Sequence, residues 1–187
     1  FDKLNLKKDA TILEINSGGG YVLDELKERK FFNFSGTTLS EKDQKLCTDK
    51  GHNVKIYDPT CLPQKDGYYD ESVDFIFLRH ALEHSPYPIF SLMEYNRVLK
   101  QYGKIYIEVP QPGCERKHEE NLNHYSILGK EQLAALIVRT GFNIDKFENF
   151  EFDVEFPDPE NPEAPKKVAR EKFYCMVATK QRPLDIK

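Results

Sequence analysis

The chain has 187 residues, of which 39% are hydrophobic and 31% are charged, an ordinary composition for a globular protein with a sizeable core. Its formal net charge of -4 gives no basic surface for nucleic acid, and no apolar run approaches the roughly 20 residues of a membrane span. We therefore expect one domain over residues 1–187, with no nucleic-acid partner and no membrane span. No signal-peptide pattern is present. The chain begins at Phe1 rather than Met, so we expect that a tag, a leader or an upstream segment is missing from this sequence.

Along the chain, the first strong pattern is ATILEINSGGGYVLDEL, residues 10–26. It predicts a buried strand at 11–15, a glycine turn, and a helix from about 21 to 30. The unpaired N–H groups of a helix that begins above such a turn can meet a ligand. The spacing fits neither the G-x-G-x-x-G dinucleotide motif nor a phosphate-binding P-loop, and a tight turn without any ligand is the alternative.

The rest of the chain continues the alternation of strands and helices. Further strands are expected at residues 31–39, 54–58, 73–78, 104–109, 142–152 and 172–180, and further helices at about 40–50, 89–99 and 130–140. Residues 101–103 are expected to turn the chain into the fifth strand, and 110–129 to form a long loop with a functional role. Residues 153–171, rich in proline and charge, predict an exposed, mobile insert.

This alternation predicts an α/β fold, a doubly wound and mostly parallel seven-stranded sheet with helices on both faces. The last two strands have no helix between them, so the final strand is expected to be antiparallel. Ligands of such sheets bind beyond the carboxyl ends of the strands. The segments to inspect are therefore 14–20, 38–40, 58–60, 79–84 and the loop from 110 onward.

The four cysteines, Cys47, Cys61, Cys114 and Cys175, are scattered and form no C-x-x-C pair. This pattern favours reduced thiols and a cytoplasmic location over a disulfide framework.

Two segments resemble the class I S-adenosylmethionine-dependent methyltransferases, in particular the type 11/12-like domains. They are ILEINSGGG at residues 12–20 and SVDFIFLRHALEHSPYPIFSLMEYNRVLKQYGKIYIEVP at residues 72–110. The resemblance, which covers about residues 10–145, implies a Rossmann-like fold and S-adenosylmethionine as cofactor, with S-adenosylhomocysteine as product. It implies a methyltransferase (EC 2.1.1.-), for which we expect a small-molecule or carbohydrate acceptor.

The same resemblance implies a set of residues around the cofactor. Glu14 would orient the glycine turn or the methionine amino group; Asn16 stands where the family has its first glycine, and Thr38 where it usually has an acid. The implied cofactor-binding residues are Glu14, Asn16, Ser17, Gly18, Gly20, Thr38, Leu39, Ser40, Asp58, Pro59, Thr60, Arg79 and His80. For two of them a structural role is the alternative, since Glu14 can cap a turn and Asp58 precedes a proline.

Methyl transfer to a hydroxyl or a protonated amine requires a base, and histidine suits that role near neutral pH. We expect His80, His84 or His124 to be this base, with Tyr125 shaping the acceptor pocket, and we assign no metal site. One alternative is a zinc peptidase, because residues 80–84 match H-x-x-E-H. Another is a module that binds S-adenosylmethionine or a partner without catalysis.

Overall fold

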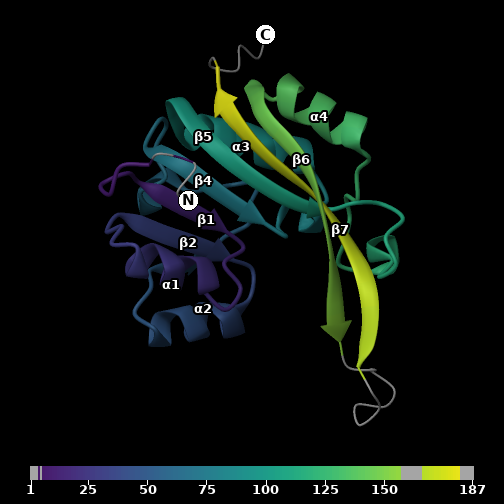
Figure 1. Ribbon diagram of the computed structural model, residues 1–187. Helices are drawn as coiled ribbons and strands as arrows, with labels where there is room; N and C mark the ends of the chain where they lie inside the picture. Colours follow the sequence, from purple (N-terminus) through teal and green to yellow (C-terminus); the bar gives the residue numbers. More distant parts are fainter. Residues whose placement is uncertain (1–3, 5, 157–165, 182–187) are drawn as a thin grey trace.

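The structure, a computed structural model, describes residues 4, 6–156 and 166–181. Its centre is a seven-stranded sheet in the order β3-β2-β1-β4-β5-β7-β6 (Figure 1). The strands are β1 Ile12–Ile15, β2 Phe34–Thr38, β3 Val54–Ile56, β4 Val73–Arg79, β5 Leu99–Pro110, β6 Phe142–Phe156 and β7 Lys167–Lys180. Because β7 runs antiparallel to both β5 and β6 while β1 to β5 are parallel, the predicted sheet is confirmed.

Helices cover both faces of this sheet (Figure 1). They are α1 Tyr21–Glu28, α2 Glu41–Asp49, α3 Pro88–Val98 and α4 Lys130–Arg139, close to the predicted ranges. Ile12 packs with Leu23 of α1 in one hydrophobic core, whereas Leu13 packs with Leu92 of α3 and Leu133 of α4 in the other. Alternate residues of β1 thus enter opposite cores, which explains why the strand is apolar almost throughout.

Helix α2 begins where the sequence indicated. The Ser40 hydroxyl is its N-cap and accepts a hydrogen bond from the backbone N–H of Asp43 at 3.1 Å. This bond satisfies one of the N–H groups that have no partner within the helix. The N-cap is thereby fixed two residues after the end of β2, next to the carboxyl edge of the sheet.

Two predicted boundaries are wrong. Residues 101–103 do not turn the chain into a strand, because β5 already begins at Leu99, which pairs with Val73 of β4. The irregularity is instead a shift of register within the β4–β5 pair, and Tyr102 adopts a φ of 64° in this part of β5.

The predicted exposed insert at 153–171 is also largely a pair of strands. Residues 153–156 extend β6 and 167–171 extend β7, so the hairpin projects far beyond the rest of the sheet (Figure 1). Antiparallel pairing satisfies the backbone groups of these charged residues, which outweighs their poor strand propensity. Glu171, expected to be exposed, is 0% exposed. The four prolines of the insert lie outside the described residues.

The long loop predicted at 110–129 is present and contains only a short 3-10 helix, η4 His118–Glu120. It is held against β7 by Glu171, whose two carboxylate oxygens accept bonds from Arg116 at 2.8 Å and His118 at 2.9 Å. All four cysteines are free thiols. None of the helices in the described part of the chain is long and apolar enough to cross a membrane.

Candidate active site

A cavity of about 290 Å³ opens at the carboxyl edge of the sheet, between the ends of β1, β2 and β4. This is the edge at which doubly wound sheets bind their ligands. The cavity is lined by Ile15, Asn16, Thr37, Thr38, Leu39, Tyr57, Pro59, Ala81, His84, Asn123 and Tyr125. Asn16, Thr38, Leu39 and Pro59 were predicted to bind the cofactor, and the cavity brings them together with His84 and Tyr125, predicted to act on the acceptor.

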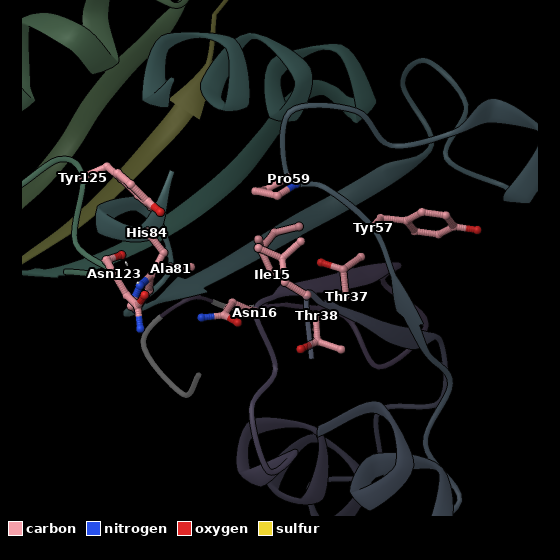
Figure 2. Close-up of a pocket in the computed structure, with 11 residues that line it drawn as sticks. Ile15, Asn16, Thr37, Thr38, Tyr57, Pro59, Ala81, His84, Asn123 and Tyr125 are labelled. Atoms are coloured by element: carbon pink, nitrogen blue, oxygen red, sulfur yellow. Dashed lines mark hydrogen bonds between the residues drawn. The ribbon is translucent and has the colours of Figure 1, made fainter. Parts of the chain in front are cut away.

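Figure 2 shows that the cavity has two ends with different chemistry. One end carries hydroxyl groups and is formed by Thr37, Thr38 and Tyr57. Apolar surface comes from Leu39, which follows Thr38 in the chain, and from Pro59, which lies beside Ile15 in this view. The other end carries imidazole, amide and phenol groups and is formed by Ala81, His84, Asn123 and Tyr125. Ile15 and Asn16 lie between them (Figure 2). Two different molecules, or two parts of one molecule, can therefore be recognised side by side.

Glu14 belongs to β1, two residues before Asn16, is 4% exposed and is not among the residues that line the cavity. Burial raises the pKa of this carboxyl to about 8, although the Ser17 hydroxyl and Arg79 act in the opposite direction. Its Oε2 atom has no hydrogen-bond partner among the described residues. A buried carboxyl with an unused oxygen is expensive unless a donor arrives from a ligand, so Glu14 fits a site that receives a cationic group.

The glycines of the turn have different roles. Gly18 has a φ of +48°, and a Cβ at this position would have no neighbour within 4 Å, so the turn is open on that side. Gly20, with a φ of +77°, is tight, because its Cβ would meet the Sγ atom of Cys47 at 3.0 Å. Gly20 therefore permits α1 to approach α2, whereas Gly18 leaves room for another molecule.

Asn16 takes the left-handed conformation that a glycine would take in the family motif, with a φ of 60°. Asparagine tolerates this conformation better than most residues. Its amide donates a 3.1 Å hydrogen bond to the carbonyl of His80 and so joins the turns after β1 and β4. The departure from glycine thus serves to hold the two turns together at the floor of the cavity.

Four predicted cofactor residues are engaged in local turns. Thr38 Oγ1 accepts a bond from the N–H of Ser40, whose own hydroxyl caps α2. One carboxylate oxygen of Asp58 accepts bonds from the N–H of Thr60 at 2.8 Å and from its hydroxyl at 2.6 Å. Ser40, Asp58 and Thr60 do not line the cavity. For Asp58 this geometry fits the alternative of a turn-forming acid.

His80 is held between two carboxylates. Its Nδ1 lies 3.4 Å from Glu83 Oε1 and its Nε2 3.2 Å from Glu108 Oε1, and Glu108 also pairs with Arg79 at 2.9 Å. Burial lowers the pKa of His80, but Glu108 and Glu83 outweigh it and raise the pKa to about 9. A histidine with this pKa is already protonated at pH 7 and is poorly suited to accept a proton.

His84 and His124 have a different environment from that of His80. His84 Nδ1 lies 2.9 Å from the carbonyl of Asn123, and His124 Nδ1 lies 2.9 Å from the carbonyl of His118. Since a carbonyl only accepts, both Nδ1 atoms carry a proton, and in the neutral form of each ring the lone pair is on Nε2. Burial and the neighbouring His84 lower the pKa of His124. The rings meet edge to face with centroids 4.8 Å apart.

The H-x-x-E-H motif does not form the α-helix that a zinc peptidase requires. Only Leu82–His84 is helical, as the short 3-10 helix η3, and it is followed by Ser85 in an extended conformation. His80 and His84 therefore do not face one another from successive turns of an α-helix.

Five residues of the cavity were not among the predicted site residues: Ile15, Thr37, Tyr57, Ala81 and Asn123. Four of them lie in or directly beside the expected segments at the strand ends, and Tyr57 could have been found as the residue before Asp58. Asn123 lies in the long loop, whose length gave the only signal. No residue of that loop could be placed beside His84 from spacing alone.

A family model described as a methyltransferase domain matches residues 1–147. This range covers most of the chain and includes both the glycine turn and the segment after β4. The chain therefore belongs to this methyltransferase domain family.

Solved structures share the fold at low sequence identity. A methyltransferase from Bacillus halodurans, described as putative, is 18% identical with a TM-score of 0.78, and the match covers 97% of this chain and 96% of that one. A Thermotoga maritima protein described as an S-adenosylmethionine-dependent methyltransferase, possibly for histamine, is 22% identical with a TM-score of 0.68, over 96% and 86% of the chains. The [4+2]-cyclase SpnF is 17% identical with a TM-score of 0.70, over 94% and 76%. No curated protein matches the chain.

Proposed function

We propose that this protein transfers the methyl group of S-adenosylmethionine to a small-molecule or carbohydrate acceptor, as a cytoplasmic enzyme of one domain (EC 2.1.1.-). The observation that carries the proposal is the two-ended cavity at the carboxyl edge of the sheet, within a methyltransferase domain. When bound, the sulfonium of the cofactor supplies an electrophilic methyl group. The four free thiols support a location in the reducing cytoplasm. The net charge of -4 supports an acceptor other than nucleic acid.

Residues that line the cavity, together with Glu14 and the glycine turn next to Asn16, fit the cofactor. The buried carboxyl of Glu14 can receive the ammonium group of the methionine part, and the open side of Gly18 lets that part lie against the backbone. Thr38 and Leu39 at the end of β2 and Pro59 after β3 offer a hydroxyl and apolar surface to the nucleoside. Binding would give the unpaired oxygen of Glu14 a charged partner, which favours the carboxylate form.

The residues at the other end would hold the acceptor. Tyr125 and Asn123 form its walls, and His84, with His124 packed against it, faces the place where the acceptor would meet the methyl group. Holding the two reactants in line at close approach can supply about 7–11 kcal/mol of rate enhancement. His80, protonated and paired with Glu83 and Glu108, positions the turn after β4 rather than accepting a proton.

The cofactor site is tested by calorimetric titration of the chain with S-adenosylhomocysteine. We expect one molecule to bind per chain, and we expect Leu39→Asp to weaken binding about tenfold or more because it places a carboxylate in the cavity. Leu46→Asp is the matched control, since Leu46 is a similarly exposed leucine outside the cavity, on α2. Absence of binding by the folded chain, or an equal loss in both variants, would contradict the proposal.

A second candidate is a protein that binds the cofactor without transferring its methyl group. The observation in its favour is that a [4+2]-cyclase shares this fold. The two candidates are separated by incubating the chain with methyl-labelled S-adenosylmethionine and a panel of hydroxyl, amine and sugar acceptors. Release of S-adenosylhomocysteine together with a labelled product supports transfer, whereas tight cofactor binding with no turnover supports the second candidate.

A further inference from the structure

Three potential metal ligands converge beside the acceptor end of the cavity. Glu83 and His84 belong to η3, and His124 belongs to the long loop. One carboxylate oxygen and one nitrogen of each ring all lie within 4.8 Å of one another. The loop is fastened to η3 at this point, because the carbonyl of Glu83 accepts bonds from the N–H groups of Tyr125 at 2.8 Å and Ser126 at 3.1 Å.

The carboxylate of this cluster has an unused oxygen. Glu83 is 1% exposed, and its Oε2 atom has no hydrogen-bond partner among the described residues. Its other oxygen lies 3.4 Å from His80, and the charge of His80 is shared with Glu108. A buried acceptor that stays unpaired is destabilising, more so when it is charged, and a cation beside Oε2 would remove this penalty.

Both histidines are oriented as metal ligands usually are. Each donates its Nδ1 proton to a backbone carbonyl, of Asn123 for His84 and of His118 for His124, which leaves Nε2 with its lone pair. Ligating histidines commonly donate their other N–H in this way, because the bond fixes the tautomer and the ring. The Asn121 amide lies 3.3 Å from His124 Nε2 and is a weak partner that an ion can displace.

A second cluster nearby, formed by Cys114, His118 and Glu171, is complete without an ion. Both carboxylate oxygens of Glu171 already accept hydrogen bonds, one from Arg116 and the other from His118. The carboxylate of Glu171 therefore needs no further partner, whereas that of Glu83 has a free oxygen within the described part of the chain. For this reason we assign the metal site to the cluster that contains Glu83.

We propose that Glu83, His84 and His124 bind a divalent transition-metal ion at the acceptor end of the cavity. Two imidazoles and one carboxylate are a common ligand set for such ions and leave coordination positions open. Since His84 also lines the cavity, an ion bound to it would lie beside the acceptor. An inference about the acceptor follows, and it rests on the proposed methyl transfer. The site favours an acceptor with two adjacent oxygen donors, at least one of them a hydroxyl.

The ion would activate the acceptor by lowering the pKa of its hydroxyl. The hydroxyl proton goes to solvent, and the oxygen lone pair forms a bond to the methyl carbon. The carbon–sulfur bond of the sulfonium breaks as this bond forms, and its electron pair remains on sulfur, which leaves a neutral thioether and a methylated acceptor. No oxidant or further reactant is consumed.

The site is tested by titrating the chelator-treated full chain with Co²⁺, followed by calorimetry and visible absorption. We expect one ion per chain with the spectrum of nitrogen and oxygen ligation, and we expect acetohydroxamate, a probe with two adjacent oxygen donors, to change that spectrum. Glu83→Gln and His124→Asn should each weaken Co²⁺ binding about tenfold or more. Glu120→Gln is the control, because Glu120 is an exposed glutamate of the same loop that pairs only with Lys117 in the described structure.

Parallel titration with S-adenosylhomocysteine separates this inference from the proposed function and shows whether each variant is folded. A chain that binds S-adenosylhomocysteine but no Co²⁺, with or without that ligand, would overturn the metal site alone. A thiolate-to-cobalt absorption band would also overturn it, because it would place the ion at a cysteine. A Co²⁺ site that depends on Glu83 in a chain without affinity for S-adenosylhomocysteine would support the metal site and remove the methyl-transfer proposal.

Discussion

At the scale of single residues, the three histidines suggested by sequence as bases divide into two kinds. His80 lies between Glu83 and Glu108, which raise its pKa, whereas the Nδ1 atoms of His84 and His124 are bound to backbone carbonyls. All three are near the carboxyl edge of the sheet, as predicted. Their partners are as far as 39 residues away in the sequence, so residue type alone could not distinguish them.

Glu14 gives a prediction at the same scale. Its folded pKa is about 8, above the ordinary value of 4.5, so the folded chain binds more protons than the unfolded chain between these values. The free energy of unfolding should therefore fall as pH rises through this window, by up to about 2 kcal/mol between pH 6 and pH 8 from this group.

The measurement is denaturant unfolding of the wild type and of Glu14→Gln at both pH values. The variant cannot ionise, so the difference in stability between the two proteins should change with pH in the direction given above. Other titrating groups, present in both proteins, cancel in this comparison. A pH-independent difference would show that Glu14 is not buried as a protonated carboxyl.

At the scale of elements, the turn after β2 contains a residue for which the sequence raised two expectations, of which the structure shows one. Ser40 was predicted both to begin α2 and to bind the cofactor, and its hydroxyl is engaged as the N-cap. We expect Ser40→Ala to reduce the free energy of unfolding by about 1 kcal/mol, the usual cost of a lost cap. Affinity for S-adenosylhomocysteine should be unchanged.

Urea unfolding and calorimetric titration of the same sample measure these two effects. Ser40→Asp, which retains a capping oxygen, is the matched variant. Its free energy of unfolding should equal that of the wild type to within a few tenths of a kcal/mol. A large loss of affinity in Ser40→Ala at unchanged stability would instead assign Ser40 to the cofactor.

The loop at 110–129 is the element that sequence described least. It is fastened at two places, by the buried Glu171 of β7 to Arg116 and His118, and by η3 to Tyr125. The first contact depends on residues that were expected to belong to a mobile insert. Extension of the β6–β7 hairpin therefore also determines where the acceptor end of the cavity is built.

At the scale of the whole molecule, the cavity is formed by turns that follow separate strands and by one long loop (Figure 2). A ligand that binds only this assembled site stabilises the folded state by mass action, by about 2.7 kcal/mol at a concentration 100 times its dissociation constant. For a chain of this length we expect saturating S-adenosylhomocysteine to raise the melting temperature by roughly 5–10 °C.

Differential scanning calorimetry with and without the ligand checks this value, with adenosine as a control that lacks the amino-acid part. A smaller shift with adenosine supports a contribution from Glu14 and the glycine turn. Equal shifts with both ligands would mean that the methionine part makes no contact with the chain.

The sequence by itself determined the order of strands and helices, the antiparallel last strand and the edge of the sheet where the cavity lies. These features follow from local periodicity, glycine turns and capping residues, which act over a few positions. Only the tertiary structure decided that Glu14 and Glu83 are buried with unused oxygens, that His80 is charged, and that the distant loop brings His124 to His84. Burial and electrostatic pairing arise between segments far apart in the chain, and no local pattern encodes them.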